Sequence, residues 1–158
     1  MMCPRKVISG GQTGADRAAL DAGLATGLAI GGCCPRGRMA EDGPIDDRYP
    51  LEEITGGYRQ RTKRNVLNAD GTVIFYHSAP EGGTEATLAF CIREKKPYKL
   101  IDTESVAAST AAGMIREFVQ RNAITSLNVA GPRESRCSGM YGFVLEALCL
   151  SLSGGGLS

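Results

Sequence analysis

The sequence has no apolar run that approaches the ~18 residues needed to cross a bilayer. Its first residues, "MMCPRKVISGG", contain no apolar core of signal-peptide length. The formal net charge of +1 argues against a broad basic surface for nucleic acid. From these absences we expect a cytoplasmic protein that binds neither a membrane nor a nucleic acid.

Motifs for metal binding and nucleophilic catalysis are also missing. The six cysteines form no CxxC pair and His77 is the only histidine, which argues against a zinc site of the usual spacing. There is no GxSxG motif and no readable catalytic triad. Most of the cysteines are expected in the core, but a reactive thiol stays open at the adjacent Cys33 and Cys34.

What the sequence does contain is an alternation of strand-like and helix-like segments along its whole length. Apolar, β-branched runs predict strands at 6–9, 28–34, 72–78, 97–102 and 126–131. Helical spacing follows each run, beginning after Thr13 as a cap and including stretches near 59–68, 111–119 and 141–152. This order predicts one α/β domain over residues 1–152, with a mostly parallel sheet covered by helices on both faces, and a frayed tail at 153–158.

Three predicted strands end in turns that suit an anion, because glycine lets backbone N–H groups point at a phosphate and the following helix adds positive potential. Arginines and hydroxyls beside them could donate to phosphate oxygens. Such turns meet at the carboxyl ends of parallel strands. The candidate ligand-binding residues are Ser9, Gly10, Gly11, Gln12, Thr13, Gly14, Gly82, Gly83, Thr84, Gly131, Arg133, Ser135 and Arg136, with Arg36 and Arg38 from the loop after the second strand.

Structural explanations compete with this interpretation. The first turn is neither a GxGxxG nor a Walker A motif, and tight strand-to-helix turns need glycine in any case. Asp16 and Glu85 could act as acid or base, but their places at helix starts explain them equally well. Arg61, Asn65 and His77 could reach the site. The acidic residues of 41–53 could ligate Mg²⁺ or simply keep that loop in water.

Five blocks of the sequence, taken in order, resemble the molybdenum-cofactor carrier family. They are "SGGQTGADRAALDAG", "GGCCPRGRMAEDGPI", "ADGTVIF", "GGTEAT" and "LNVAGPRES". The family belongs to a circularly permuted branch of the Rossmann-like superfamily that includes the lysine-decarboxylase-like, cytokinin-activating proteins. The resemblance implies a Rossmann-like three-layer sandwich that self-associates as a dimer or tetramer. It also implies binding of molybdenum cofactor, with molybdoenzymes as candidate recipients.

The resemblance favours a binding protein over an enzyme. Related hydrolases carry PGGxGTxxE, and the position of that glutamate here is Thr87. We therefore expect a carrier for molybdenum cofactor or a similar phosphorylated pterin or nucleotide. The alternatives are a phosphoribohydrolase-like enzyme that uses Asp16 or Glu85, and a nucleotide-sensing module. For the carrier, we expect Gly11→Val to weaken ligand binding and leave the fold intact.

Overall fold

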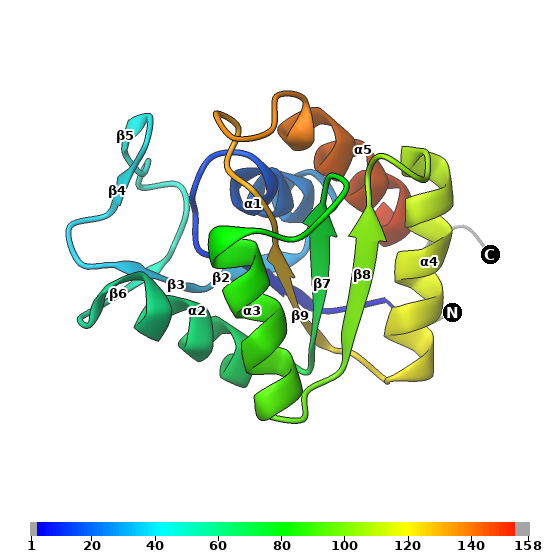
Figure 1. Ribbon diagram of the computed structural model, residues 1–158, viewed down its shortest axis with the longest axis horizontal. Coiled ribbons are helices and arrows are strands. Elements are labelled where there is room, and N and C mark those ends of the chain that lie inside the picture. Colours follow the sequence, from blue (N-terminus) through cyan, green and yellow to red (C-terminus); the bar gives the residue numbers. More distant parts are fainter. Residues whose placement is uncertain (1–2, 154–158) are drawn as a thin grey trace.

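In a computed structural model of the protein, which describes residues 3–153, a five-stranded sheet lies between two layers of helices (Figure 1). The strand order is β2-β1-β9-β7-β8 and every pairing is parallel. The strands are β1 (Lys6–Ile8), β2 (Ala29–Gly31), β7 (Gly71–Tyr76), β8 (Tyr98–Asp102) and β9 (Ser126–Ala130). The predicted α/β, Rossmann-like sandwich is confirmed.

One face of the sheet is covered by α1 (Ala15–Ala25), α4 (Ala108–Arg121) and α5 (Met140–Ser153). The alanines of α1 make this packing close, because a face without bulky side chains lets the helix approach its neighbours. Ala15, Ala18, Ala19 and Ala22 are all fully buried, as their spacing predicts. They belong to the largest apolar cluster, which also includes Val7, Ile115 and Leu148.

The opposite face is covered by α2 (Gly57–Asn68) and α3 (Gly82–Arg93). A second, smaller cluster of Val66, Ile74, Phe90 and Cys91 joins these helices to the sheet. Residues 71–75 of β7 are buried, which confirms that this strand is central and covered on both faces. Buried parallel strands have this continuous apolar pattern because helices lie on both sides.

The chain order creates a switch point in the sheet. β1 leads to β2 at one side, whereas β7 leads to β8 at the other, and β9 fills the gap between β1 and β7. In open α/β sheets, ligands bind outside the carboxyl ends of the strands at such a point. The fold therefore fixes the place where a site is expected.

The predicted strand at 28–34 is in fact two strands separated by Gly32. β2 pairs with β1, whereas β3 (Cys33–Pro35) leaves the sheet and pairs with β6 (Glu52–Ile54). Gly32 has φ +131°, and an added Cβ would lie 2.0 Å from the Ser9 carbonyl oxygen. The break therefore needs glycine, because only glycine permits this close approach.

The long loop after β3 contains the short antiparallel hairpin of β4 (Met39–Ala40) and β5 (Gly43–Pro44), which we call the hairpin 39–44. The loop has its own apolar cluster, in which Ile45, Tyr49 and Leu51 pack with Leu20 and Cys34. The loop is consequently folded against α1. No helix among residues 3–153 is long and apolar enough to cross a membrane.

Two local predictions differ from the structure. Thr13 does not cap α1, because Gly14 is the N-cap and the helix has no side-chain capping hydrogen bond. Ser153 still belongs to α5, and the rest of the predicted tail, 154–158, lies outside the described residues.

Candidate ligand-binding pocket

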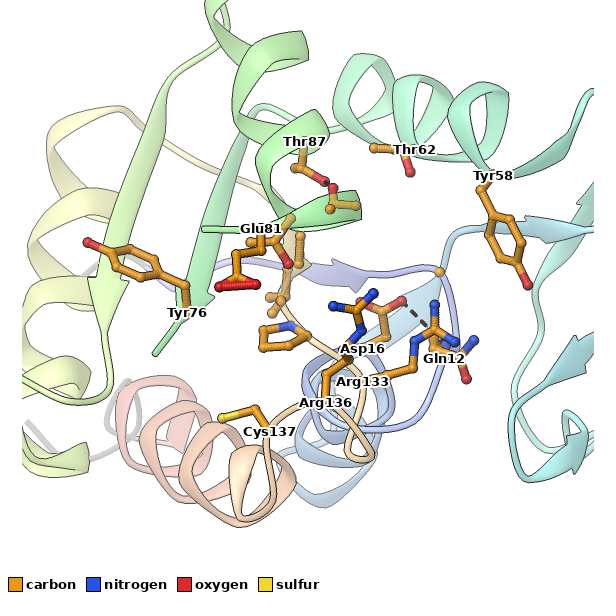
Figure 2. A pocket seen from close by; sticks show the side chains of 18 of the residues that line it. Gln12, Asp16, Tyr58, Thr62, Tyr76, Glu81, Thr87, Arg133, Arg136 and Cys137 are labelled. Atoms are coloured by element: carbon orange, nitrogen blue, oxygen red, sulfur yellow. Dashed lines mark hydrogen bonds between the residues drawn. The ribbon is translucent and has the colours of Figure 1, made fainter. Parts of the chain in front are cut away.

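A cavity of about 470 Å³ lies at the carboxyl ends of β1, β7 and β9, with α2 and α3 on its other side (Figure 2). Its walls come from the β1–α1 turn, α2, the β7–α3 loop and the β9–α5 loop. This volume falls in the range of pockets that hold small ligands. The cavity is therefore where the fold predicts a site.

A buried ion pair forms one wall. Asp16 Oδ2 lies 3.3 Å from Arg61 Nη1, and the two side chains are 7% and 16% exposed. Burial raises the pKa of Asp16, and the neighbouring Arg61 and the Gln12 amide offset only part of that effect. The buried Nε of Arg61 has no hydrogen-bond partner among the residues that the structure describes.

The glycines of the first turn make room for the protein's own atoms. An added Cβ at Gly10 would lie 1.6 Å from Arg61 Nη1, and one at Gly11 would lie 2.5 Å from Leu51 Cδ1. At Gly14 it would lie 2.4 Å from the Pro132 carbonyl oxygen. Close approach explains all three glycines, but the approaching groups belong to the protein. Gly11→Val would therefore disturb the packing of the long loop against this turn.

Three amides of the same turn are also occupied by the protein. Gly11 N–H donates to Ser9 Oγ at 3.4 Å, and Gln12 N–H donates to Asp16 Oδ2 at 3.3 Å. Thr13 N–H donates to Gln12 Oε1 at 3.0 Å, and Ser9 Oγ itself donates to the Asp16 carbonyl oxygen. Of the predicted residues in this turn, only Gly10 and Gln12 line the cavity.

Two hydroxyls predicted to meet a phosphate are hydrogen-bonded to an exposed carboxylate of the protein itself. Glu41, in the hairpin 39–44, accepts hydrogen bonds from Thr13 Oγ1, from Ser135 Oγ at 2.6 Å and from Ser135 N–H at 3.2 Å. These bonds hold the pKa of Glu41 below its usual value. Neither Thr13 nor Ser135 is among the residues that line the cavity.

The two arginines of the loop after the second strand also lie away from the cavity lining. The Arg38 guanidinium donates to the carbonyl oxygens of Leu51 and Ile45 at 3.3 Å, and to those of Asp46 and Tyr49 at 2.9 Å. Arg38 thus holds the long loop together. Arg36 is exposed.

The second glycine turn is open to the cavity. Gly82, Gly83 and Thr84 line it, and a Cβ added at either glycine would meet no atom within 4 Å. Glu85 is exposed and does not belong to the lining. Thr87, at the position of the hydrolase glutamate, does line the cavity, and its hydroxyl donates to the Gly83 carbonyl oxygen at 3.0 Å.

The third turn contributes Gly131 and the exposed Arg133 and Arg136. Glu134 fixes the loop, because its carboxylate accepts the N–H groups of Gly139 and Tyr141, each at 2.8 Å. Among residues 3–153, neither arginine forms an ion pair. Two guanidinium groups are therefore available at the mouth of the cavity.

Several lining residues escaped the sequence analysis, namely Tyr58, Thr62, Glu81, Asn128 and Cys137. Tyr58 and Thr62 lie on α2. This helix does not follow a strand of the central sheet through a glycine turn, so the pattern that identified the other site residues does not apply to them. Arg61, Asn65 and His77, which could reach the site, all line it. Cys33 and Cys34 are buried, and burial raises the pKa of both thiols.

The acidic residues of 41–53 do not gather into a metal site. Asp42 pairs with Arg17 at 3.0 Å, and Glu53 accepts the Gly37 N–H at 2.8 Å. Across the part of the chain that the structure describes, no group of three histidine, cysteine, aspartate or glutamate side chains could hold a metal ion.

Fold and cavity together define a Rossmann-like α/β protein with an open pocket of mixed polar and apolar lining at the switch point of its sheet. The chain belongs to the circularly permuted YpsA SLOG family, whose sequence model matches residues 7–152. It is 40% identical to a protein from Syntrophus aciditrophicus named "putative molybdenum carrier protein", whose crystal structure superposes with a TM-score of 0.92. The match covers 95% of this chain and 96% of that one. These matches confirm the family resemblance. A comparison with curated proteins found no match.

Proposed function

We propose that the protein is a carrier that binds molybdenum cofactor, or a similar phosphorylated pterin or nucleotide, in the pocket at the switch point. One observation carries the proposal. The cavity is lined by Arg133 and Arg136, which form no ion pair within residues 3–153, and by Arg61, whose buried Nε has no hydrogen-bond partner among those residues. A buried donor without a partner costs about 1–3 kcal/mol, which a ligand oxygen can recover. The name of the Syntrophus protein supports the same conclusion.

The phosphate end of the ligand belongs at the third turn. Guanidinium groups bind phosphate oxygens in pairs, and both Arg133 and Arg136 line the cavity at this turn. The start of α3 is a weaker phosphate site, because Glu81 and Glu85 add negative charge beside Gly82 and Gly83. We assign those glycines to the wall that the ring system approaches.

The pocket fits this ligand in size and chemistry. About 470 Å³ accommodates a pterin with a phosphate, and the lining mixes apolar surface with hydroxyls such as those of Thr62 and Thr84. Molybdenum cofactor brings its own metal and dithiolene. The protein's part is to bind the phosphate, enclose the ring and exclude water, with no chemical step required.

The direct test uses Arg133→Gln/Arg136→Gln, with Arg36→Gln as a matched control that removes an exposed arginine away from the cavity. Each protein is purified without oxygen and analysed by native mass spectrometry for bound pterin. Affinity for a pterin monophosphate is then measured by calorimetry. We expect a loss of about tenfold or more in the double variant and no change in the control. Equal affinity in all three proteins would contradict the proposal.

A hydrolase is the second candidate, and Asp16 favours it, because a buried carboxyl with a raised pKa in a pocket suits a general acid. Its pairing with Arg61 explains the same residue without catalysis. Release of ribose 5-phosphate from nucleoside monophosphates, abolished in Asp16→Asn, would support the enzyme. No turnover with retained binding supports the carrier.

A carrier must also hand over its ligand. We include in the proposal self-association as a dimer or tetramer and transfer to molybdoenzymes. Light scattering across a concentration series measures the first. Activation of a cofactor-free molybdoenzyme by the loaded protein measures the second.

A further inference from the structure

The pocket contains an acidic side chain that the proposed function does not use. Glu81 precedes α3 as its N-cap, with extended backbone angles of φ −138° and ψ 157°, and its side chain makes no capping hydrogen bond. In Figure 2 the carboxylate is directed into the cavity. Among residues 3–153 it has no ion pair.

Several other polar side chains of the lining already have partners in the protein. Asp16 is paired with Arg61, and Asn65 exchanges two hydrogen bonds with the backbone of Cys33 at 2.7 and 3.0 Å. Asn128 donates to Thr72 Oγ1 at 3.2 Å. Of the two acids in the lining, Glu81 is therefore the one that remains available to a ligand.

Glu81 and the free arginines belong to different walls. Arg133 and Arg136 come from the β9–α5 loop, whereas Glu81 comes from the β7–α3 loop, and Figure 2 shows both sets directed into the same space. The pocket is consequently bipolar. Glu81 is exposed to solvent in the unliganded protein. A ligand that covers this carboxylate while its phosphate occupies the arginines removes its water, so it must offer hydrogen-bond donors in return.

We propose that Glu81 determines specificity by accepting two adjacent N–H donors of the ligand ring, the 2-amino and ring N–H groups of a 2-amino-4-oxopyrimidine edge. Pterins and guanine share this edge, and a carboxylate can bind both donors at once. Hypoxanthine lacks the amino group, and adenine presents an acceptor beside its amino group. This inference rests on the proposed function and identifies the ring that the pocket selects.

The test compares Glu81→Gln with Glu85→Gln, a matched control one helical turn along. Both side chains are exposed, but only Glu81 lines the cavity. Calorimetry measures the affinities of GMP, IMP and a pterin monophosphate for each protein. In the wild type we expect the two ligands with the amino group to bind about 10- to 100-fold more tightly than IMP. Glu81→Gln should reduce this preference to less than about threefold and leave IMP affinity unchanged or higher. Glu85→Gln should keep the wild-type preference.

The outcomes separate this inference from the proposed function. If Glu81→Gln keeps the preference, or weakens all three ligands equally, the assignment of Glu81 is overturned although the carrier proposal stands. If none of the phosphorylated ligands binds, or binding ignores the arginine substitutions, the carrier proposal itself fails. Comparison of GMP with the pterin monophosphate shows which of the two sources of this edge the pocket prefers.

Discussion

The first and second glycine turns have the same place in the fold, since each follows a parallel strand and precedes a helix, yet they differ in what surrounds them. In the first turn, a Cβ at Gly10, Gly11 or Gly14 would collide with protein atoms at 1.6–2.5 Å. In the second, a Cβ at Gly82 or Gly83 would meet nothing within 4 Å. Glycine thus serves internal packing in one turn and leaves open surface in the other.

The largest effect that this comparison predicts is the loss of stability in Gly14→Ala. The backbone at Gly14 has φ +77° and ψ −129°, and the new methyl would press on the Pro132 carbonyl oxygen, which cannot rotate away. Strain and crowding together should lower the free energy of unfolding by about 3 kcal/mol. Chemical denaturation measures this change.

Gly27→Ala is the control for that substitution, because Gly27 also has φ +77° but no atom within 4 Å of an added Cβ. It should cost only the conformational strain, about 1 kcal/mol. If both variants lose the same stability, crowding by the third turn plays no part and the comparison of the turns is wrong.

Gly10→Ala should have the next largest effect, because its methyl must displace the Arg61 guanidinium and weaken the buried pair with Asp16. We expect a loss of about 2 kcal/mol, since an unpaired buried charge is costly. Introducing the same change into Arg61→Ala should cost clearly less. Denaturation measures the loss of unfolding free energy caused by Gly10→Ala in the wild type and in Arg61→Ala. Equal losses in the two proteins would show that Gly10 does not act through Arg61.

The packing of the hairpin 39–44 against the first and third turns should depend on pH. Hydrogen bonds from Ser135 and Thr13 hold the pKa of Glu41 below its usual value, so the native state favours the ionised form. The ionised Glu41 carboxylate contributes fully to the docking of the hairpin above the usual pKa, near 4.5. This contribution is lost as the pH falls through the lowered pKa.

Nuclear magnetic resonance can follow this titration through the Ser135 amide between pH 6 and pH 3. Glu41→Gln should remove the transition. A transition that persists in that variant would assign the effect to another group. Asp42→Asn is then the next variant to examine, because Asp42 of the same hairpin pairs with Arg17 of α1 and its pKa is also lowered.

The smallest effect on stability is expected for Gly83→Ala. The position is helical and open, so the free energy of unfolding should change by less than about 1 kcal/mol. The methyl projects into open space in the wall of the pocket, so affinity for a pterin monophosphate should decrease. A variant with full affinity would indicate that the ligand does not approach this turn.

The sequence predicts most of the fold because its signals are local. The alanine spacing of α1 and the apolar run of β7 each specify an element within a few residues, and both are confirmed. The split of the second strand escaped prediction, because it depends on how closely Gly32 approaches Ser9. That contact joins residues 23 positions apart, and no pattern within the strand marks it.

The candidate site was harder to predict for the same reason. Glu41 is hydrogen-bonded to Ser135, 94 residues away in the sequence, and Arg61 to Asp16, 45 residues away. The groups that contact the first turn therefore come from distant parts of the sequence. Arg133 and Gly82 do line the cavity because parallel strands bring their carboxyl ends together, which the alternation of elements already indicates.

Chemical-shift mapping with a pterin monophosphate tests the central claim most directly, since it reports both turns in one titration. The account predicts that the amides of Gly82, Gly83, Gly131 and Arg133 shift on addition of the ligand, whereas those of Gly11 and Thr13, already bonded to Ser9 and Gln12, do not. Shifts centred on Gly11 and Thr13, with none at Gly131 or Arg133, would contradict it.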